Sequence, residues 1–436
     1  MKLWLPLVFC AGMAHAAPQY VDLPTVLRLA GAKNEEIDLA RVQHRQALLE
    51  SDQTWQRFWP SLQTGAQYRA HEGLIQDVAG AMLETRKQQY SAVAGVQIDW
   101  APGDTFYAAL AAKQKAAALA HSIAKVRLDI EREATERFYE LLAAEAAQAV
   151  LSEEVLVTER YAAQLENAVQ VGTAFRGDLL RLQTQISRLQ IQIRQSQEAL
   201  QLAAARLAET LRLPPETELR PAKAELIPVH SAPRAPLFEL IQMAQAQRPE
   251  LKSMDATVAA LAREEDRSRL GPLVPNVQAG YTAGGLAGGR GSSTGRMSEQ
   301  QDAFLGLGWK IGPGGLFDTT RQKAAAARRE AASLQTARIR AAIGREVVDA
   351  SVRSASCVEQ IKLAEKAVGS AEEMTRLAAQ RQASQVGVVL EFVLAREELA
   401  KARLARARAV VDFNRAQQAL RYAVGESAKI VEAAKP

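Results

Sequence analysis

Cysteine, histidine and aromatic residues are scarce in this chain, and each scarcity excludes a class of protein. Two cysteines and five histidines among 436 residues leave no Cys-x-x-Cys or His-x-x-x-His spacing. The sequence therefore predicts no metal site, no cofactor and no enzyme. Uninterrupted apolar runs are also short, and none reaches the roughly 18 residues of a transmembrane helix. The chain is instead rich in Ala, Leu, Gln, Arg and Glu, a composition that is typical of long helices.

The charge is nearly balanced. Fifty-four basic and 49 acidic residues give a formal net charge of +5, and the two signs alternate along the helical stretches. This pattern favours a solvated, salt-bridged helix surface over a nucleic-acid-binding surface. We expect no nucleic-acid partner.

The first 16 residues have the pattern of a signal peptide. Lys2 is followed by an apolar run over residues 3–12 and by a small-x-small site that ends at Ala16, which predicts cleavage before Ala17. Cys10 raises the alternative of lipidation, but the bulky Phe9 precedes it where a lipoprotein signal has a small residue. After cleavage Cys357 is the single thiol, and we expect a small buried apolar role for it.

The chain repeats itself at an offset of 209 to 215 residues. Glu36 corresponds to Glu250, and Gly172 to Gly387. The segment beginning at Pro60 recurs at Pro275, and the pair Trp100 and Phe106 recurs as Trp309 and Phe317. A period this long is too large for a solenoid unit, so it indicates a duplicated half-molecule.

Four segments alternate apolar and polar residues with the period of a β-strand. Their apolar positions are Leu62, Thr64, Ala66 and Tyr68; Ala94, Val96, Ile98 and Trp100; Val277, Ala279 and Tyr281; and Ala303, Leu305, Leu307, Trp309 and Ile311. Each segment is about 9–11 residues long, as expected of strands that cross an outer membrane. Alternation alone also allows a soluble sheet. We expect surface loops at residues 72–91 and 286–301, and the glycine-rich second loop lacks the context of a phosphate-binding loop.

Long helices make up most of the rest. Residues 105–169 contain neither Pro nor Gly, and a second limb covers residues 178–211. In this limb one apolar set follows three-four spacing, while Leu180, Ile191 and Leu202 repeat every eleven residues on another face. Two apolar faces predict neighbours on both sides, as in the wall of a tube. Residues 320–385 and 391–424 repeat the pair.

A short turn joins the limbs of each hairpin. Residues 170–178 and 385–391 contain a glycine for the chain reversal and then a carboxylate, Asp178 or Glu391. Asp178 is expected to cap the returning helix. A cap alone does not explain the apolar residues at the turns, so a docking surface is the alternative. Its candidate residues are Val171, Gly172, Phe175, Asp178, Leu179, Val386, Gly387 and Leu390.

Residues 214–236 contain six prolines and no helical or strand period. We interpret them as an extended strap outside the tube, with a disordered linker as the alternative. The predicted organisation is a signal peptide (1–16), a first repeat (17–213), the Pro-rich linker (214–236), a second repeat (237–426) and a C-terminal tail (427–436).

The duplicated plan resembles the TolC-type outer-membrane efflux proteins. The Pro60 and Pro275 strand starts, the helix opening at residues 248–251, the Gly-Leu-Phe-Asp sequence at 315–318 and the two turns carry the resemblance, which extends over nearly the whole mature chain. The order, spacing and duplication of these features are specific, although no single motif is.

The resemblance implies a mainly α fold with a β-barrel portion. Long helical hairpins would form a periplasmic α-barrel, and each chain would give four strands to a shared transmembrane β-barrel. It further implies a homotrimer in the outer membrane of a Gram-negative bacterium, in contact with outer-membrane lipid. The hairpin turns would meet a periplasmic adaptor (membrane fusion) protein tied to an inner-membrane transporter.

The resemblance places Glu391 at the tip aperture, as a gate. Leu394 stands where the family can have a second carboxylate, and Gly387 lies only four residues before Glu391, so the second turn departs from the family pattern. One acidic ring is therefore expected in place of two.

Physical chemistry independently requires a shared barrel. Unpaired strand edges cannot face hydrocarbon, and four strands cannot close on themselves. The predicted function is thus a passive exit duct of a tripartite efflux or secretion system. The alternative is a soluble periplasmic coiled-coil adaptor or scaffold, which would lack outward apolar strand faces and need no detergent for extraction.

Overall fold

The computed structural model describes residues 18–32, 34–214, 216–222, 226–290, 295–384 and 389–426. The predicted signal peptide with its cleavage site at Ala16 and Ala17, the turn residues Val386 and Gly387, and the predicted tail at 427–436 lie outside these residues.

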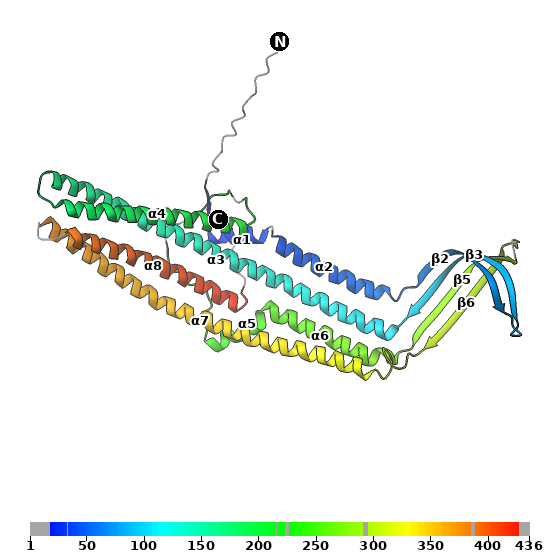
Figure 1. Ribbon diagram of the computed structural model, residues 1–436. Coiled ribbons are helices and arrows are strands. Elements are labelled where there is room, and N and C mark those ends of the chain that lie inside the picture. The colour runs from blue at the N-terminus through cyan, green and yellow to red at the C-terminus, as the bar shows by residue number, and fades with distance from the viewer. Residues whose placement is uncertain are drawn as a thin grey trace, which may run out of the picture. The chain divides into compact units, whose positions relative to one another are not determined.

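The elements follow one another in the same order twice (Figure 1). A short strand, two helices, two long strands and two long helices make up each half of the chain. The first half has β1 (Gln19–Val21), α1 (Leu23–Ala32), α2 (Glu35–Gln56), β2 (Ser61–Gln76), β3 (Met82–Trp100), α3 (Pro102–Gln170) and α4 (Arg176–Thr210). The second has β4 (Leu219–Pro221), α5 (Leu237–Gln247), α6 (Pro249–Leu270), a 3-10 turn (Gly271–Leu273), β5 (Asn276–Arg290), β6 (Ser298–Gly308), α7 (Thr319–Ala383) and α8 (Val389–Ala423).

The chain divides into two compact units, and each takes segments from both halves. Of the described residues, unit 1 comprises those within 18–38, 124–249 and 340–426, and unit 2 those within 39–123 and 250–339.

Unit 1 contains most of two helical hairpins, α3–α4 and α7–α8, of which α3 and α7 begin in unit 2 (Figure 1). Their limbs form where the sequence lacks Pro, and Ala, Leu, Glu, Gln and Arg are strong helix formers. The four predicted limbs agree with the observed helices to within a few residues. Where α3 packs on α4, Leu151 and Val155 lie against Leu189, a member of the predicted three-four row. The side chains of the eleven-residue row, Leu180, Ile191 and Leu202, are exposed.

The main core of unit 1 joins the hairpins to the two short strands. Leu141, Leu207 and Val411 from three long helices pack with Val21 of β1 and Leu219 of β4. β4 pairs in parallel with β1. Part of the predicted strap is thus a short strand, although residues 214–236 have no strand period: the pairing depends on backbone groups of residues 19–21, about 200 positions away, which no local period reveals.

After β4 the strap runs along α8 and is held by two buried amides. Asn414 accepts a hydrogen bond from the Val229 amide (2.7 Å) and donates one to the Ile227 carbonyl (3.0 Å). Gln417 accepts bonds from the backbone amides of residues 231 and 232. Cys357 is buried as predicted, in a cluster with Phe413 of α8. Burial, with a smaller effect of the nearby Asp412 charge, raises the pKa of the Cys357 thiol.

Unit 2 contains an antiparallel sheet in the order β2-β3-β5-β6. All four predicted strands are present, but three are longer than expected, with 16, 19 and 15 residues for β2, β3 and β5. The loop predicted at 72–91 is wrong for most of its length, because β2 and β3 pair as far as Gln76 and Met82. The loop predicted at 286–301 is too long at both ends, since β5 reaches Arg290 and β6 begins at Ser298, and residues 291–294 lie outside the described residues. In the added parts of these strands, charged residues and glycines break the apolar–polar alternation of the sequence, but the backbone pairing between strands continues.

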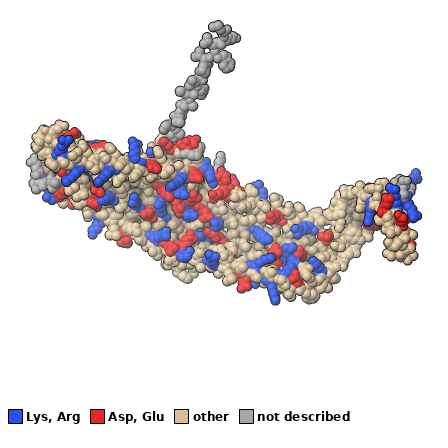
Figure 2. Space-filling view, viewed as in Figure 1, with Lys and Arg blue, Asp and Glu red and all other residues tan. Residues whose placement is uncertain are grey.

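The strand register brings the four predicted apolar faces onto one side of the sheet. Directly opposed residues share a face, and Leu62 opposes Val96, which opposes Tyr281, which opposes Ala303. The other side carries mostly Gln, Gly, Ser and Thr. Both sides are largely exposed in the single chain. In the view of Figure 2, the middle of the strands has no charged side chain, whereas the far ends of the strands carry both signs.

The fold class is confirmed as mainly helical with a four-stranded portion. Among the described residues, no helix combines the length and the hydropathy needed to cross a bilayer.

Candidate functional site at the hairpin turns

The first hairpin turn has a defined backbone geometry. Gly172 has a left-handed φ of 76°, its amide donates to the carbonyl of Val169 (3.1 Å), and the amide of Thr173 donates to the carbonyl of Ala168 (2.9 Å). These two bonds form a Schellman motif, which ends α3 and requires a residue that tolerates positive φ. The turn is thus built mainly by backbone bonds, joined by one from the Thr173 hydroxyl to the Ala168 carbonyl (3.0 Å), and it leaves Val171 and Phe175 free for other contacts.

Two of those side chains project into solvent. Val171 and Phe175 are each 74% exposed. The ring of Phe175 lies over Gly177, where a Cβ atom would come within 2.3 Å of the ring. The absence of that Cβ lets the phenyl ring rest on the first turn of α4, so the ring is held in an exposed position.

Asp178 does not cap α4, contrary to the sequence prediction. The N-cap residue is Phe175, which makes no side-chain capping bond, and Asp178 lies in the first turn, followed by Leu179. Its carboxylate is 3.5 Å from the guanidinium of Arg181. A carboxylate at this position still meets the positive end of the helix dipole. The misassignment arose because the helix begins at Arg176, two residues earlier than expected.

At the second turn Glu391 is paired within its own hairpin. It lies in the first turn of α8, and its Oε1 atom accepts a hydrogen bond from Arg381 Nη1 of α7 at 2.8 Å. Leu390 and Leu394 beside it are exposed. An acidic ring at this level would therefore carry a basic partner for each carboxylate.

The two hairpins touch close to their turns. The ring of Tyr161 on α3 lies 4.6 Å, centroid to centroid, from that of Phe392 on α8, and the Tyr161 hydroxyl accepts a hydrogen bond from Gln382 of α7. Burial, followed by the charge of Asp178, raises the pKa of Tyr161 to about 12. The first-turn carboxylate and the second hairpin are thus brought together around one neutral phenol.

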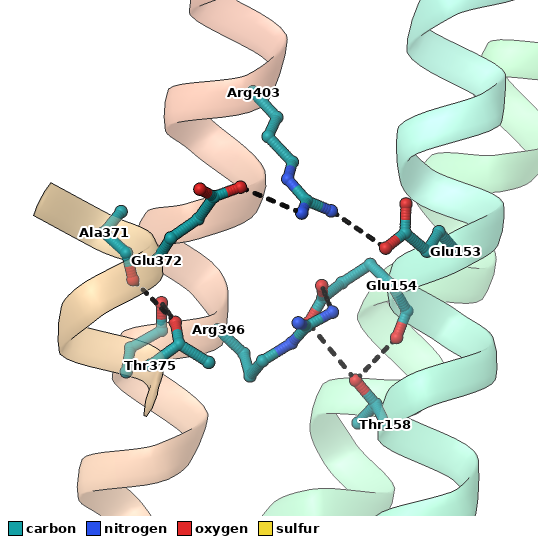
Figure 3. A network of polar contacts seen from close by, with 9 residues as sticks. Glu153, Glu154, Thr158, Ala371, Glu372, Thr375, Arg396 and Arg403 are labelled. Carbon is teal, nitrogen blue, oxygen red and sulfur yellow. Dashed lines mark hydrogen bonds and ion pairs between the residues drawn. The ribbon is translucent and has the colours of Figure 1, made fainter. Parts of the chain in front are cut away.

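A buried ion pair connects the hairpins farther from the turns (Figure 3). Arg396 Nη2 of α8 lies 2.6 Å from Glu154 Oε2 of α3, and the side chains are 12% and 7% exposed. Thr158 donates from Oγ1 to the backbone carbonyl of Glu154 (2.8 Å). A charge pair so well removed from water fixes the relative position of the two helices, because either partner alone would be a buried, uncompensated charge.

Arg403, which follows Arg396 on α8, forms a second link between the helices (Figure 3). Its guanidinium contacts Glu153 of α3 at 2.8 Å and Glu372 of α7 at 3.3 Å. Burial lowers the pKa of Arg403, but its bonds to the two carboxylates more than offset this, so the pKa is raised. The Arg403 side chain thereby links α8 to both α3 and α7.

Two rows of exposed apolar side chains mark unit 1. Leu180, Ile191 and Leu202 lie on α4, and Val352, Leu363 and Met374 lie on α7 with the same eleven-residue spacing. The row on α7 was missed from the sequence because alanines surround it, although its spacing is visible in the sequence.

Sequence reasoning also missed Tyr161, Arg396 and Arg403. Arg396 and Glu154 are 242 residues apart, and no local pattern distinguishes them from the many exposed Arg and Glu residues of these helices. Among the described residues there is no group of three His, Cys, Asp or Glu side chains suited to a metal ion.

Comparison with known proteins identifies the fold. Residues 240–426 match the family model of outer membrane efflux proteins. No curated protein matches the chain by sequence. Nearly the whole chain superposes on solved structures of outer-membrane channels, so the fold implied by the resemblance to the TolC-type outer-membrane efflux proteins is confirmed.

Three of these structures serve as examples. The outer-membrane channel OprN has a TM-score of 0.79 at 18% identity, over 93% of this chain and 90% of its own. The outer membrane protein VceC of Vibrio cholerae has a TM-score of 0.75 at 18% identity, over 93% and 96%. The outer membrane channel CmeC of Campylobacter jejuni has a TM-score of 0.78 at 14% identity, over 92% and 85%. At these identities the likeness shows the shared fold.

Proposed function

We propose that this chain, which matches the outer membrane efflux proteins over residues 240–426 and shares the fold of outer-membrane channels over nearly its whole length, is the outer-membrane exit duct of a tripartite efflux system. It is a passive conduit that spans the outer membrane, extends into the periplasm and docks with a periplasmic adaptor and an inner-membrane pump.

One observation carries this proposal: the register that collects the apolar residues of four strands on one face of an open-edged sheet. An uncovered face with Leu62, Val96, Tyr281 and Leu305 is unfavourable in water and favourable against lipid. The opposite face, with Gln63, Gln97, Gln278 and many glycines, suits a water-filled lumen. A soluble adaptor has no use for such a sheet.

The open edges of β2 and β6 require further copies of the chain. Orphan backbone amides and carbonyls at those edges would each cost several kcal/mol in hydrocarbon. The exposed rows on α4 and α7 support the same conclusion, because helices with matching eleven-residue rows can pack side by side along a tube. Three copies give twelve strands, and a homotrimer is the number that the family implies.

The turn residues Val171, Gly172, Phe175, Asp178, Leu179, Val386, Gly387 and Leu390 form the proposed adaptor-docking surface, and Glu391 belongs to the aperture. Support comes from the two apolar side chains at 74% exposure on a turn whose backbone bonds are already satisfied. Apolar groups held out in this way are typical of a protein contact.

The double variant Val171→Ser, Phe175→Ser tests the docking role. We expect intact cells to accumulate pump substrates as if the channel were absent, while the oligomer remains in the outer membrane, because the Schellman bonds do not use these side chains. Phe238→Ser is the matched control, since Phe238 on α5 is 70% exposed but lies outside the turns. Efflux unaffected by the double variant would contradict docking at the turns.

A further inference from the structure

The segment from Trp309 to Asp318, between β6 and α7, forms a compact loop in unit 2. The amide of Leu316 donates to the carbonyl of Lys310 (2.8 Å), and the amide of Gly312 donates to the carbonyl of Leu316 (2.9 Å). Asp318 closes the loop, because its carboxylate accepts bonds from the amides of Gly314 (2.8 Å) and Arg321 (2.9 Å). The loop is therefore ordered by its own bonds, without the help of a partner.

This loop presents two large apolar side chains to solvent. Ile311 is 71% exposed and Phe317 is 79% exposed. Phe317 has a left-handed φ of 66°, which is strained for a bulky residue. Phe317 thus has a strained backbone conformation, although its side chain contributes almost nothing to the core of the protein. An apolar environment outside the chain would account for that arrangement.

Other residues of the same loop, Trp309, Lys310, Gly314 and Gly315, line a small cationic pocket. Its volume is about 280 Å³, at the low end of ligand pockets, and its lining includes Lys310, Arg267, Arg321 and Asp104. Arg267 is bound to Asp104 through two bonds of 2.8 and 2.6 Å and also contacts Glu264 at 3.3 Å, and Arg321 reaches Asp104 at 3.2 Å.

Lys310 supplies the surplus positive charge of the pocket. Its ammonium group has no carboxylate partner among the residues that the structure describes, whereas both guanidinium groups share Asp104. The pocket therefore has an unneutralised cation beside the apolar side chain of Trp309, and the loop that carries both residues also exposes Ile311 and Phe317.

We propose that this pocket binds the phosphate of an anionic phospholipid in the inner leaflet of the outer membrane, with Lys310 as the main contact and Ile311 and Phe317 inserted among the adjoining acyl chains. The inference rests on the proposed function, since the loop follows directly on a strand that crosses the bilayer. That position puts Trp309 at the level where interfacial aromatic residues meet lipid headgroups. A lipid fits better than free phosphate, because only a lipid both occupies the cationic pocket and contacts the exposed apolar side chains of the loop.

The test measures binding of phosphatidylglycerol, phosphatidylcholine and inorganic phosphate to the detergent-extracted oligomer by native mass spectrometry. We expect the native protein to retain phosphatidylglycerol in preference to phosphatidylcholine. Lys310→Gln should weaken phosphatidylglycerol binding about fivefold, the loss of roughly one lysine near an anionic surface. Lys113→Gln removes the same charge from an exposed site on α3 and should leave binding unchanged.

Phe317→Gly separates lipid contact from folding. Glycine adopts positive φ freely, so this variant should be at least as heat-stable as the native protein and yet bind phosphatidylglycerol more weakly. Equal binding of the two lipids, equal losses in Lys310→Gln and Lys113→Gln, or displacement of phosphatidylglycerol by equimolar inorganic phosphate would each overturn the lipid site. None of these three outcomes would contradict the proposed exit duct. A native protein that stays soluble without detergent would instead overturn the proposed function.

Discussion

At the scale of single residues, the hairpin ends combine free apolar side chains with neutralised charges. Val171 and Phe175 are exposed, whereas Glu391 is engaged by Arg381 at 2.8 Å. An acidic ring built from Glu391 alone would repel itself when three copies approach one another. Pairing each carboxylate with an arginine of the same hairpin removes much of that repulsion and leaves a site whose net charge depends on both partners.

Replacing Arg381 and replacing Glu391 should shift the ion selectivity of the channel in opposite directions. Arg381→Gln leaves the Glu391 carboxylate unneutralised, so the channel in a planar bilayer should become more cation-selective. Glu391→Gln leaves the guanidinium and should reduce cation preference. The measurement is the reversal potential under a salt gradient. If both variants keep the native reversal potential, Glu391 does not belong to the aperture.

The sequence predicted the presence of these turns better than their chemistry. Gly172 could be recognised because a chain reversal needs positive φ. The partner of Glu391 could not, because Arg381 is one of several basic residues near the end of α7 and its choice depends on how the helix is rotated. Asp178 was predicted to cap α4, but the helix begins at Arg176 and has no side-chain cap.

At the scale of elements, the long helices follow from their sequence and the strands only in part. Stretches rich in strong helix formers and poor in Pro and Gly predicted the four long limbs, and the observed helices agree. The alternating segments identified the apolar faces of β2, β3 and β5, but not the extensions of β2 beyond Arg69 or of β3 before Ala92. Those extensions are set by cross-strand pairing, such as that of Glu72 with Arg86, and no local period reveals it.

The link between the two hairpins depends on the buried pair of Arg396 and Glu154. Arg396→Met should cost about 3–5 kcal/mol of unfolding free energy, because it leaves a carboxylate with 7% exposure uncompensated. The double variant Arg396→Met, Glu154→Leu should recover much of that loss. Thermal or denaturant unfolding of the extracted protein gives the comparison.

An exposed pair provides the control for this effect. Lys362 and Glu359 are 2.8 Å apart on α7 with both side chains largely exposed, so Lys362→Met should change stability by less than about 1 kcal/mol. Equal losses in Arg396→Met and Lys362→Met would mean that the buried pair has no special part in joining the hairpins.

At the scale of the whole molecule, one chain supplies an incomplete structure. Its sheet has an apolar face without cover and two edges without partners, and its helices carry apolar rows on α4 and α7. Each of these features is costly in an isolated chain and would be satisfied in the proposed duct, where copies stand side by side in a membrane. The duplicated order of elements gives every copy the same two sets of strands and hairpins for that purpose.

The mass of the detergent-extracted native particle tests this conclusion most directly. Native mass spectrometry of protein taken from outer membranes should give three chains per particle, with no monomer until the particle is denatured. A water-soluble monomer recovered without detergent would contradict the shared barrel, and with it the exit duct.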